Sequence, residues 1–262
     1  MPNITEICLG DLSFNFLLSG GNPLSGISHL GKEVDSEMLK YFTFSNIFDY
    51  LRQCEEMGID TIVARIDKFV MRVLMQYWDM GGHIKWIGQT AKEYGSMLTN
   101  INEALRSGAS AVYIHGGTFD RHVEKRDYEE ILNSIDFCKN AGVPIGIASH
   151  NPTNLKMVVD QGWDNDFFLM SLHNVGTKDV FDDADRIYAL ETLAYLNKPC
   201  LLYKILSAGR KTLEQGFADV SKFIRPQDGV IVGMCPSFNQ QMVKENAEYI
   251  YRLRESLFFH NN

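Results

Sequence analysis

The sequence predicts one α/β domain, residues 1–262, in which eight parallel strands close into a (β/α)8 TIM barrel. Short aliphatic or β-branched runs alternate along the chain with longer segments of helical character, which is typical of parallel β/α units. Between Arg65 and Met234 the runs end about every 28 residues, close to the spacing of a barrel of ~250 residues. A doubly wound open sheet is the alternative fold.

The first run follows what we expect to be a short N-terminal strand or hairpin. Each run is short and bounded by polar or turn-forming residues, as buried parallel strands are. The predicted strands are Phe14–Leu18, Thr61–Arg65, Lys85–Gln89, Ala111–His115, Pro144–Ser149, Phe167–His173, Leu201–Leu206 and Val230–Met234.

The intervening segments carry apolar residues at helical spacing, clearest in the last one, and several have recognisable ends. The predicted stripe of the last helix is Val243, Ala247, Ile250, Leu253 and Leu257. Helix starts are predicted at Asn151 before Pro152, and at the capping boxes formed by Thr212 with Gln215 and by Ser237 with Gln240. Gly58, Gly108 and Gly142 precede strands and suit left-handed helix ends.

The segment 19–43 is predicted to be one long first loop, because it is rich in glycine and polar residues. Long loops at the mouth of a barrel commonly cover a substrate. Two interpretations stay open, a lid over the mouth and an ordered connector without a functional role.

Composition indicates an ordinary folded metabolic protein. Hydrophobic residues make up 45% and charged residues 22% of the chain, and the net charge is −8. The acidic balance argues against nucleic-acid or anionic-membrane partners, and no leader or membrane-spanning stretch is visible. We therefore expect a cytoplasmic protein that binds a small molecule; the sequence specifies no oligomeric state.

The five cysteines are scattered and form no Cys-x-x-Cys pair, so we expect reduced, mostly buried thiols. Cys235 alone is kept open as a reactive thiol, because it follows a strand beside other candidates. The histidines at strand ends, with Asp67 or Asp120, could in principle hold a divalent metal, although their spacing matches no metal motif.

Polar side chains gather where the predicted strands end, which is where barrel enzymes place their chemistry. We assign catalytic roles to His115, Lys204, Asp67 and His150, and substrate-binding roles to Arg65, His173, Gln89 and Asn22. Because successive strand residues point to opposite sides, Arg65 and Asp67 should share a side. Ser149 and His150 should point to opposite sides, and so should Tyr203 and Lys204, so only one residue of each of these two pairs should face the mouth. Taken singly, each residue is better interpreted as a hydrogen-bonded structural side chain, and the convergence of several favours a site.

Two late loops are candidates for binding an anion. The segments ending at Arg210 and at Ser237 both precede predicted helices, and helix N-termini in the last two βα loops of such barrels often bind phosphate. An ordinary capped turn with Arg210 in solvent is the alternative.

Several segments from Ala109 to Tyr249 resemble aldo-keto reductases. The matching segments are SAVYIHGG, AGVPIGIASHNPTNLKMVVDQG, MSLHNV, LLYKILSAGR and GMCPSFNQQMVKENA, in the order of the family's strands. The resemblance implies a nicotinamide-dependent barrel in which His115 polarises a carbonyl, Ser149 holds the carboxamide, Tyr203 stacks on the nicotinamide, and Asn246 lies in the cofactor segment.

The sequence departs from that family at its proton-donating residues. Val63 stands at the position of the aspartate, Lys68 at that of the tyrosine, and Gln89 near that of the lysine. His150 replaces an asparagine, Met170 replaces a glutamine, and Met242 stands near the basic residue for the adenosine phosphate. Loss of a positioned acid usually lowers a rate by about 10²–10⁴-fold.

These observations support three hypotheses. The first is an isomerase or lyase that uses acid/base chemistry on a small polar carbonyl or sugar-like metabolite, with His115 as acid or oxyanion partner, Arg65 and Asp67 as a substrate clamp, and Lys204 as a cation or imine-forming amine. The second is an atypical NAD(P)H-dependent reductase. The third is a barrel that binds a ligand without turnover.

Overall fold

Eight parallel strands form a closed barrel in the order β10-β3-β4-β5-β6-β7-β8-β9, which confirms the predicted fold. The computed structural model describes residues 6–173 and 181–258. The barrel strands are β3 (Leu17–Gly20), β4 (Thr61–Arg65), β5 (Lys85–Gln89), β6 (Ala111–Ile114), β7 (Ile145–Ser149), β8 (Phe167–Ser171), β9 (Cys200–Tyr203) and β10 (Gly229–Gly233). Nearly all their side chains are buried, as expected when helices cover the outside of the barrel.

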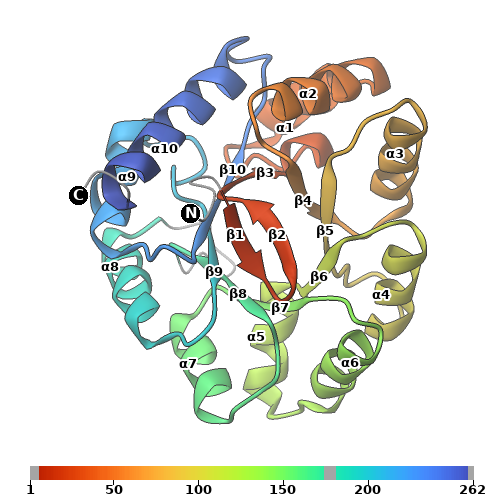
Figure 1. Ribbon diagram of the computed structural model, residues 1–262, viewed down its shortest axis with the longest axis vertical. Coiled ribbons are helices and arrows are strands. Elements are labelled where there is room, and N and C mark those ends of the chain that lie inside the picture. The colour runs from red at the N-terminus through yellow and green to blue at the C-terminus, as the bar shows by residue number, and fades with distance from the viewer. Residues whose placement is uncertain (1–5, 174–180, 259–262) are drawn as a thin grey trace.

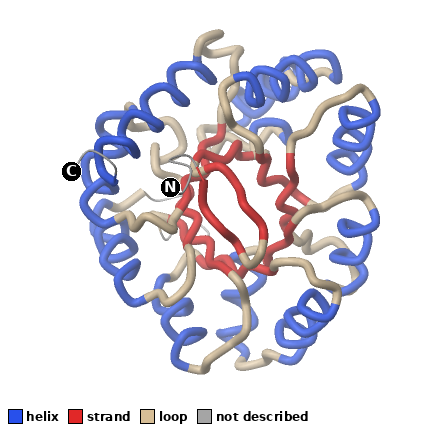
Figure 2. The backbone as a smooth tube through the Cα atoms, in the orientation of Figure 1, coloured by secondary structure: helices blue, strands red, loops and turns tan. Residues whose placement is uncertain are grey.

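Helices surround the strands as an outer ring (Figures 1 and 2). They are α1 (Lys32–Tyr41), α2 (Phe44–Glu56), α3 (Lys68–Asp79), α4 (Met97–Arg106), α5 (Gly116–Lys125), α6 (Glu129–Asn140), α7 (Pro152–Asp160), α8 (Asp183–Thr192), α9 (Leu213–Phe223) and α10 (Met242–Phe258), with short 3-10 turns η1 (Pro23–Ser25) and η2 (Leu193–Tyr195). Within the part of the chain that is described, no helix is long and apolar enough to cross a membrane.

The N-terminal hairpin closes the amino-terminal end of the barrel. Strands β1 (Glu6–Leu9) and β2 (Leu12–Asn15) pair antiparallel and lie across the barrel centre in Figure 2. Lys85, the first residue of β5, donates to the Ser13 carbonyl at 2.7 Å. Because the hairpin seals this end, the opposite end is left as the mouth.

The first predicted strand was placed wrongly. The run Phe14–Leu18 spans the end of β2 and the start of β3, with Phe16 between them. Phe14 pairs with Ile7 of the hairpin, whereas Leu17 pairs with Val230 of the barrel. Apolar residues continue across the boundary between β2 and β3, so the sequence does not show where the pairing partner changes.

The segment 19–43 is an ordered part of the mouth and not one long loop. Ser19 and Gly20 belong to β3, and η1 and α1 follow. Ser28 donates to Asp35 through both its backbone nitrogen and its hydroxyl, which ties the connection to α1. This helix was not predicted because its apolar face is small: Met38 is its one buried residue, and Val34 and Tyr41 are only partly buried against the core.

Most predicted helix ends are confirmed. Asn151 caps α7 with Pro152 as its first residue, and Thr212 forms a complete capping box with Gln215. Gly58, Gly108 and Gly142 have the positive φ angles of left-handed helix ends. The expected box of Ser237 with Gln240 is wrong, because α10 begins later, at Met242.

Candidate functional site

The carboxyl ends of the barrel strands surround one cavity of about 530 Å³. Most of the predicted site residues line it, although they come from six strands or their loops and from α10. Those lining it are Asn22, Arg65, Gln89, His115, His150, Tyr203, Lys204 and Asn246. Those outside its lining are Asp67, Ser149, His173, Arg210 and Ser237.

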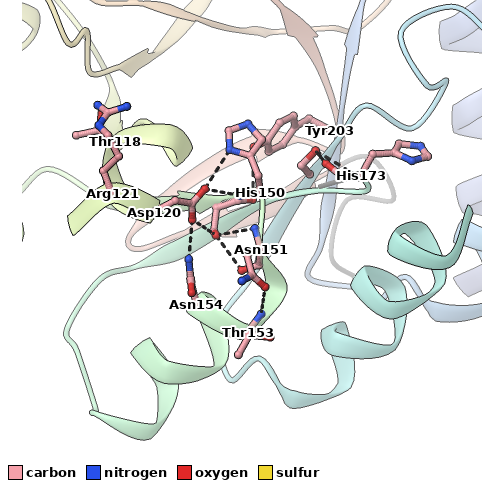
Figure 3. Close-up of polar contacts among 11 residues, drawn as sticks. Thr118, Asp120, Arg121, His150, Asn151, Thr153, Asn154, His173 and Tyr203 are labelled. Atoms are coloured by element: carbon pink, nitrogen blue, oxygen red, sulfur yellow. Dashed lines mark hydrogen bonds and ion pairs between the residues drawn. The ribbon is translucent and has the colours of Figure 1, made fainter. Parts of the chain in front are cut away.

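His150 is held by Asp120, which lies on α5. Its backbone nitrogen and its ring Nδ1 each lie 3.1 Å from Asp120 Oδ2 (Figure 3). A carboxylate only accepts hydrogen bonds, so Nδ1 carries a proton. In the neutral ring, Nε2 is therefore the nitrogen with the lone pair, which is the arrangement a general base requires.

Asp120 is itself fixed in place as an anion. Burial opposes its charge, but hydrogen bonds from His150, Ser149 and Asn154 outweigh burial and lower the pKa of this carboxyl below its ordinary value. The Asn154 amide donates at 2.8 Å, and the Ser149 hydroxyl donates to the same oxygen. From the sequence, Asp120 is a candidate only as a metal ligand. Its contact with His150 joins α5 to the end of β7, 30 residues away, and so could not be predicted from local patterns.

His115 lies beside His150 at the start of α5. The two ring centroids are 6.3 Å apart, and the His115 backbone nitrogen donates to Thr90 Oγ1 at 3.0 Å. Burial, with smaller contributions from His150, Arg121 and Arg65, lowers the pKa of His115 from 6.5 to about 4. Near neutral pH this imidazole is uncharged, so it suits hydrogen bonding to a carbonyl oxygen better than donation of a full proton.

An NMR titration is expected to place the His115 midpoint near pH 4, because burial disfavours the imidazolium. Between about pH 4 and 6.5 the unfolded chain binds this proton more readily than the folded chain, so the contribution of His115 to stability is complete above 6.5 and is lost as the pH falls through that window. The C2 proton shift of His115 would be followed, with His115→Gln providing the assignment. A midpoint at or above 6.5 would contradict the burial of this ring.

Tyr203 and Lys204 both face the cavity, against the alternation expected for a strand. Strand β9 ends at Tyr203, and Lys204 has a left-handed φ of 60°, which turns its side chain to the same side. The Tyr203 ring lies 6.2 Å from that of His150. Burial, followed by nearby Tyr113 and Asp120, raises the pKa of Tyr203 well above its ordinary value, so the phenol stays protonated, and it donates a long hydrogen bond of 3.5 Å to the Ser149 carbonyl.

Ser149 and His150 point to opposite sides, as strand alternation predicts. Ser149 is fully buried and directed at Asp120, while His150 lines the cavity. The serine therefore supports the anion that holds His150, and it does not reach the cavity where the resemblance would place a nicotinamide carboxamide.

Arg65 lines the cavity, whereas Asp67 is the N-cap residue of α3. Asp67 caps α3 by accepting from the Val70 nitrogen at 2.9 Å, and its other oxygen lies 3.4 Å from Arg65 Nε. Glu93 is a second carboxylate partner of Arg65. Gln89, nearby, accepts from the Tyr113 hydroxyl at 2.6 Å.

His173 lies behind the cavity wall. It is fully buried, with Nδ1 3.1 Å from the Asp182 carbonyl and Nε2 2.9 Å from the Ser207 hydroxyl. The carbonyl must accept, so Nδ1 is the donor and Nε2 of the neutral ring accepts from Ser207. Burial is the main cause that lowers the pKa of His173 and keeps it neutral. The residue supports the β9–α9 loop and does not reach the cavity.

The residues present do not fit the nicotinamide arrangement of aldo-keto reductases. Of the five cofactor contacts proposed from sequence, Tyr203 and Asn246 line the cavity. Arg210 is exposed and donates to the His29 carbonyl at 2.8 Å, and Ser237 is exposed beside Cys235. Lys68, at the position of the family's tyrosine, is exposed on α3 and paired with Glu103.

The two late loops differ from the predicted anion sites at their helix starts. In α9 the capping box of Thr212 with Gln215 uses the backbone nitrogens of these two residues. Ser237 precedes α10, which begins at Met242, by several residues.

Metal ligands are not grouped. Among residues 6–173 and 181–258, no group of three or more histidine, cysteine or acidic side chains is arranged to hold a metal ion. All five cysteines are free, and all but Cys8 are buried. Cys235 lines the cavity with its Sγ 3.2 Å from the Ser237 hydroxyl.

Comparison with known proteins supports the fold. No family model and no curated protein sequence matches the chain. Similar solved structures include an aldo-keto reductase from Bacillus halodurans in its holo form, at 13% identity and TM-score 0.62, with 97% of this chain and 96% of that chain covered.

Other similar structures carry different activities in their names. A truncated 3-deoxy-D-arabino-heptulosonate 7-phosphate synthase from Thermotoga maritima is 14% identical, with TM-score 0.55 and coverage of 98% and 92%. The N-acetylmannosamine-6-phosphate 2-epimerase from Clostridium perfringens is 10% identical, with TM-score 0.54 and coverage of 77% and 85%. The chain thus has an aldo-keto-reductase-like barrel, a scaffold it also shares with an epimerase and a synthase.

Proposed function

We propose that this protein is an acid/base enzyme of the isomerase or lyase type, which moves a proton at the carbon next to a carbonyl in a small, polar, sugar-like metabolite. The observation that carries the proposal is the pairing of His150 with Asp120, which leaves Nε2 of a cavity-lining imidazole as the basic nitrogen. Two uncharged hydrogen-bonding rings, His115 and Tyr203, lie within 6.3 Å of the His150 ring, measured between centroids.

The roles of the residues follow from their charges. His150 removes the proton, while the neutral His115 or the Tyr203 phenol donates a hydrogen bond to the carbonyl oxygen as negative charge develops there. Lys204 adds a positive charge on the same side as Tyr203. Arg65, Gln89 and Asn22 contact the rest of the molecule from the strands opposite.

Hydrogen–deuterium exchange at carbon tests this proposal directly, because it reports the proton transfer itself and does not depend on the later steps of the reaction. The protein is incubated in D2O with a panel of small hydroxylated ketones and aldehydes, and label at the carbon next to the carbonyl is measured by NMR. Protein-dependent exchange is expected with at least one compound. Absence of exchange across neutral and anionic members of the panel would reject the proposed chemistry.

An atypical NAD(P)H-dependent reductase is the second candidate, favoured by the positions of His115, Tyr203 and Asn246 around the cavity. The placement of Ser149 and Lys68 argues against it. Fluorescence titration with NADH and NADPH separates the two candidates. Saturable quenching by either cofactor would favour the reductase, and no signal with both would eliminate it.

We also infer a cytoplasmic location, which is supported by five cysteines that remain free thiols. Disulfides are rare in that reducing compartment. The expected partner is a small molecule, because most of the candidate residues converge on one cavity of about 530 Å³.

A further inference from the structure

The charge of the cavity is opposite to that of the whole chain. The protein has a net charge of −8, yet its cavity is lined by Arg65, Lys204 and Lys211. Among the described residues that line it, none is an aspartate or glutamate. Local positive charge in a cleft attracts anions even when the overall charge is negative.

The cations are not equivalent. Arg65 already has two carboxylate partners, Asp67 and Glu93. Lys211 pairs with Asp183, whose side chain is 73% exposed, and such solvent-exposed pairs are weak and easily exchanged. Lys204 and Lys211 both lie on the β9–α9 loop, so two of the three cations that line the cavity belong to one loop.

This loop is built in an unusual backbone conformation. Lys204, Ser207 and Ala208 have φ angles of 60°, 49° and 56°, in the left-handed region that non-glycine residues rarely adopt. Such conformations persist where the surroundings enforce them, and they cluster at ligand-binding sites. Here Ser207 is held by the buried ring of His173, and its backbone nitrogen donates to the Lys204 carbonyl at 2.9 Å.

We propose that the substrate carries an anionic group, a carboxylate or a phosphate ester, and that Lys204 and Lys211 bind it. This inference rests on the proposed function, because it places the reacting carbonyl of the same molecule toward His150. Tyr203 adjoins Lys204 in the chain, its ring is 6.2 Å from that of His150, and His150 and both lysines line the same cavity. His173 is a positioning residue: its ring holds Ser207, whose backbone nitrogen in turn donates to the Lys204 carbonyl.

Calorimetry with two matched pairs of probes tests the anion site. Dihydroxyacetone phosphate is compared with dihydroxyacetone, and pyruvate with hydroxyacetone. At least one anion is expected to bind about 10- to 100-fold more tightly than its neutral counterpart, since charge-assisted hydrogen bonds have that effect. The pair that shows the preference identifies phosphate or carboxylate as the anionic group.

Variants connect this preference to the loop. Lys204→Gln and Lys211→Gln are each expected to weaken anion binding about tenfold or more, and to weaken binding of the neutral probes by less. Lys222→Gln, on the exposed side of α9, is the matched control and should bind as the parent does. Equal binding of anionic and neutral probes, no binding of either anion, or anion binding that survives both substitutions would each overturn the proposal.

Measurement on the His150→Gln protein separates this inference from the proposed function. Anion preference retained without exchange at carbon would support the anion site independently of turnover. If the parent exchanges protons only in neutral carbonyls and prefers no anion, the acid/base function stands and the anion site is rejected.

Discussion

Replacing His150 by glutamine is expected to lower the rate of proton exchange at carbon by about 10²–10⁴-fold, the usual contribution of a positioned general base. Glutamine keeps a polar side chain near Asp120 but has no basic nitrogen. The measurement is the initial rate of label incorporation in D2O for the best compound of the panel, with circular dichroism to verify folding.

Asp120→Asn and His83→Gln are the companions of that variant. An asparagine amide can donate to Nδ1 and favour the other ring tautomer, so D120N should lose activity and change its pH profile while substrate binding persists. His83 is exposed and outside the cavity lining, so H83Q should retain the parent rate. An H150Q rate within twofold of the parent would remove His150 from its proposed role.

Asp219→Ala is expected to destabilise the protein by about 3–5 kcal/mol, because it leaves a buried guanidinium without its charge partner. Arg186 is 1% exposed, and its Nε and Nη2 lie 2.6 and 2.7 Å from the two Asp219 oxygens. The free energy of unfolding would be measured by urea denaturation. Asp49→Asn, at an exposed ion pair with Arg52, is the control and should change it by no more than about 0.5 kcal/mol.

The same ion pair supports the mouth of the barrel. Arg186 Nη1 donates to the Ile205 carbonyl at 2.9 Å, immediately after Lys204. A double variant, Asp219→Ala with Arg186→Met, removes both charges and should recover part of the lost stability. If D219A alone unfolds at the same urea concentration as the parent, the buried Arg186 guanidinium does not require the charge of Asp219 for stability.

Sequence patterns predicted the strands of the barrel well because each strand is a short buried run that ends in polar residues. Thr61–Arg65 and Lys85–Gln89 coincide with β4 and β5. The first strand was misplaced because apolar character continues from the hairpin into the barrel, and α1 was missed because it buries little. Both errors arise where local hydrophobicity does not reflect the partner against which a segment packs.

The candidate site was predicted in outline and misassigned in part. His115, His150, Tyr203 and Lys204 do line one cavity, since parallel strands must present their carboxyl ends together. His173 and Ser149 stand at similar strand ends but turn away to hold Ser207 and Asp120. Linear position could not distinguish these two groups, because a side chain's direction at a strand end depends on where the strand stops.

By itself the sequence determined the closed barrel and the end at which its polar residues gather, because both follow from the alternation and spacing of local segments. Only the tertiary structure decided that Asp120 holds His150, that Lys204 turns into the cavity beside Tyr203, and that Arg186 is buried against Asp219. These depend on contacts between residues about 30 positions apart and on single backbone angles, which no local pattern of residue types encodes.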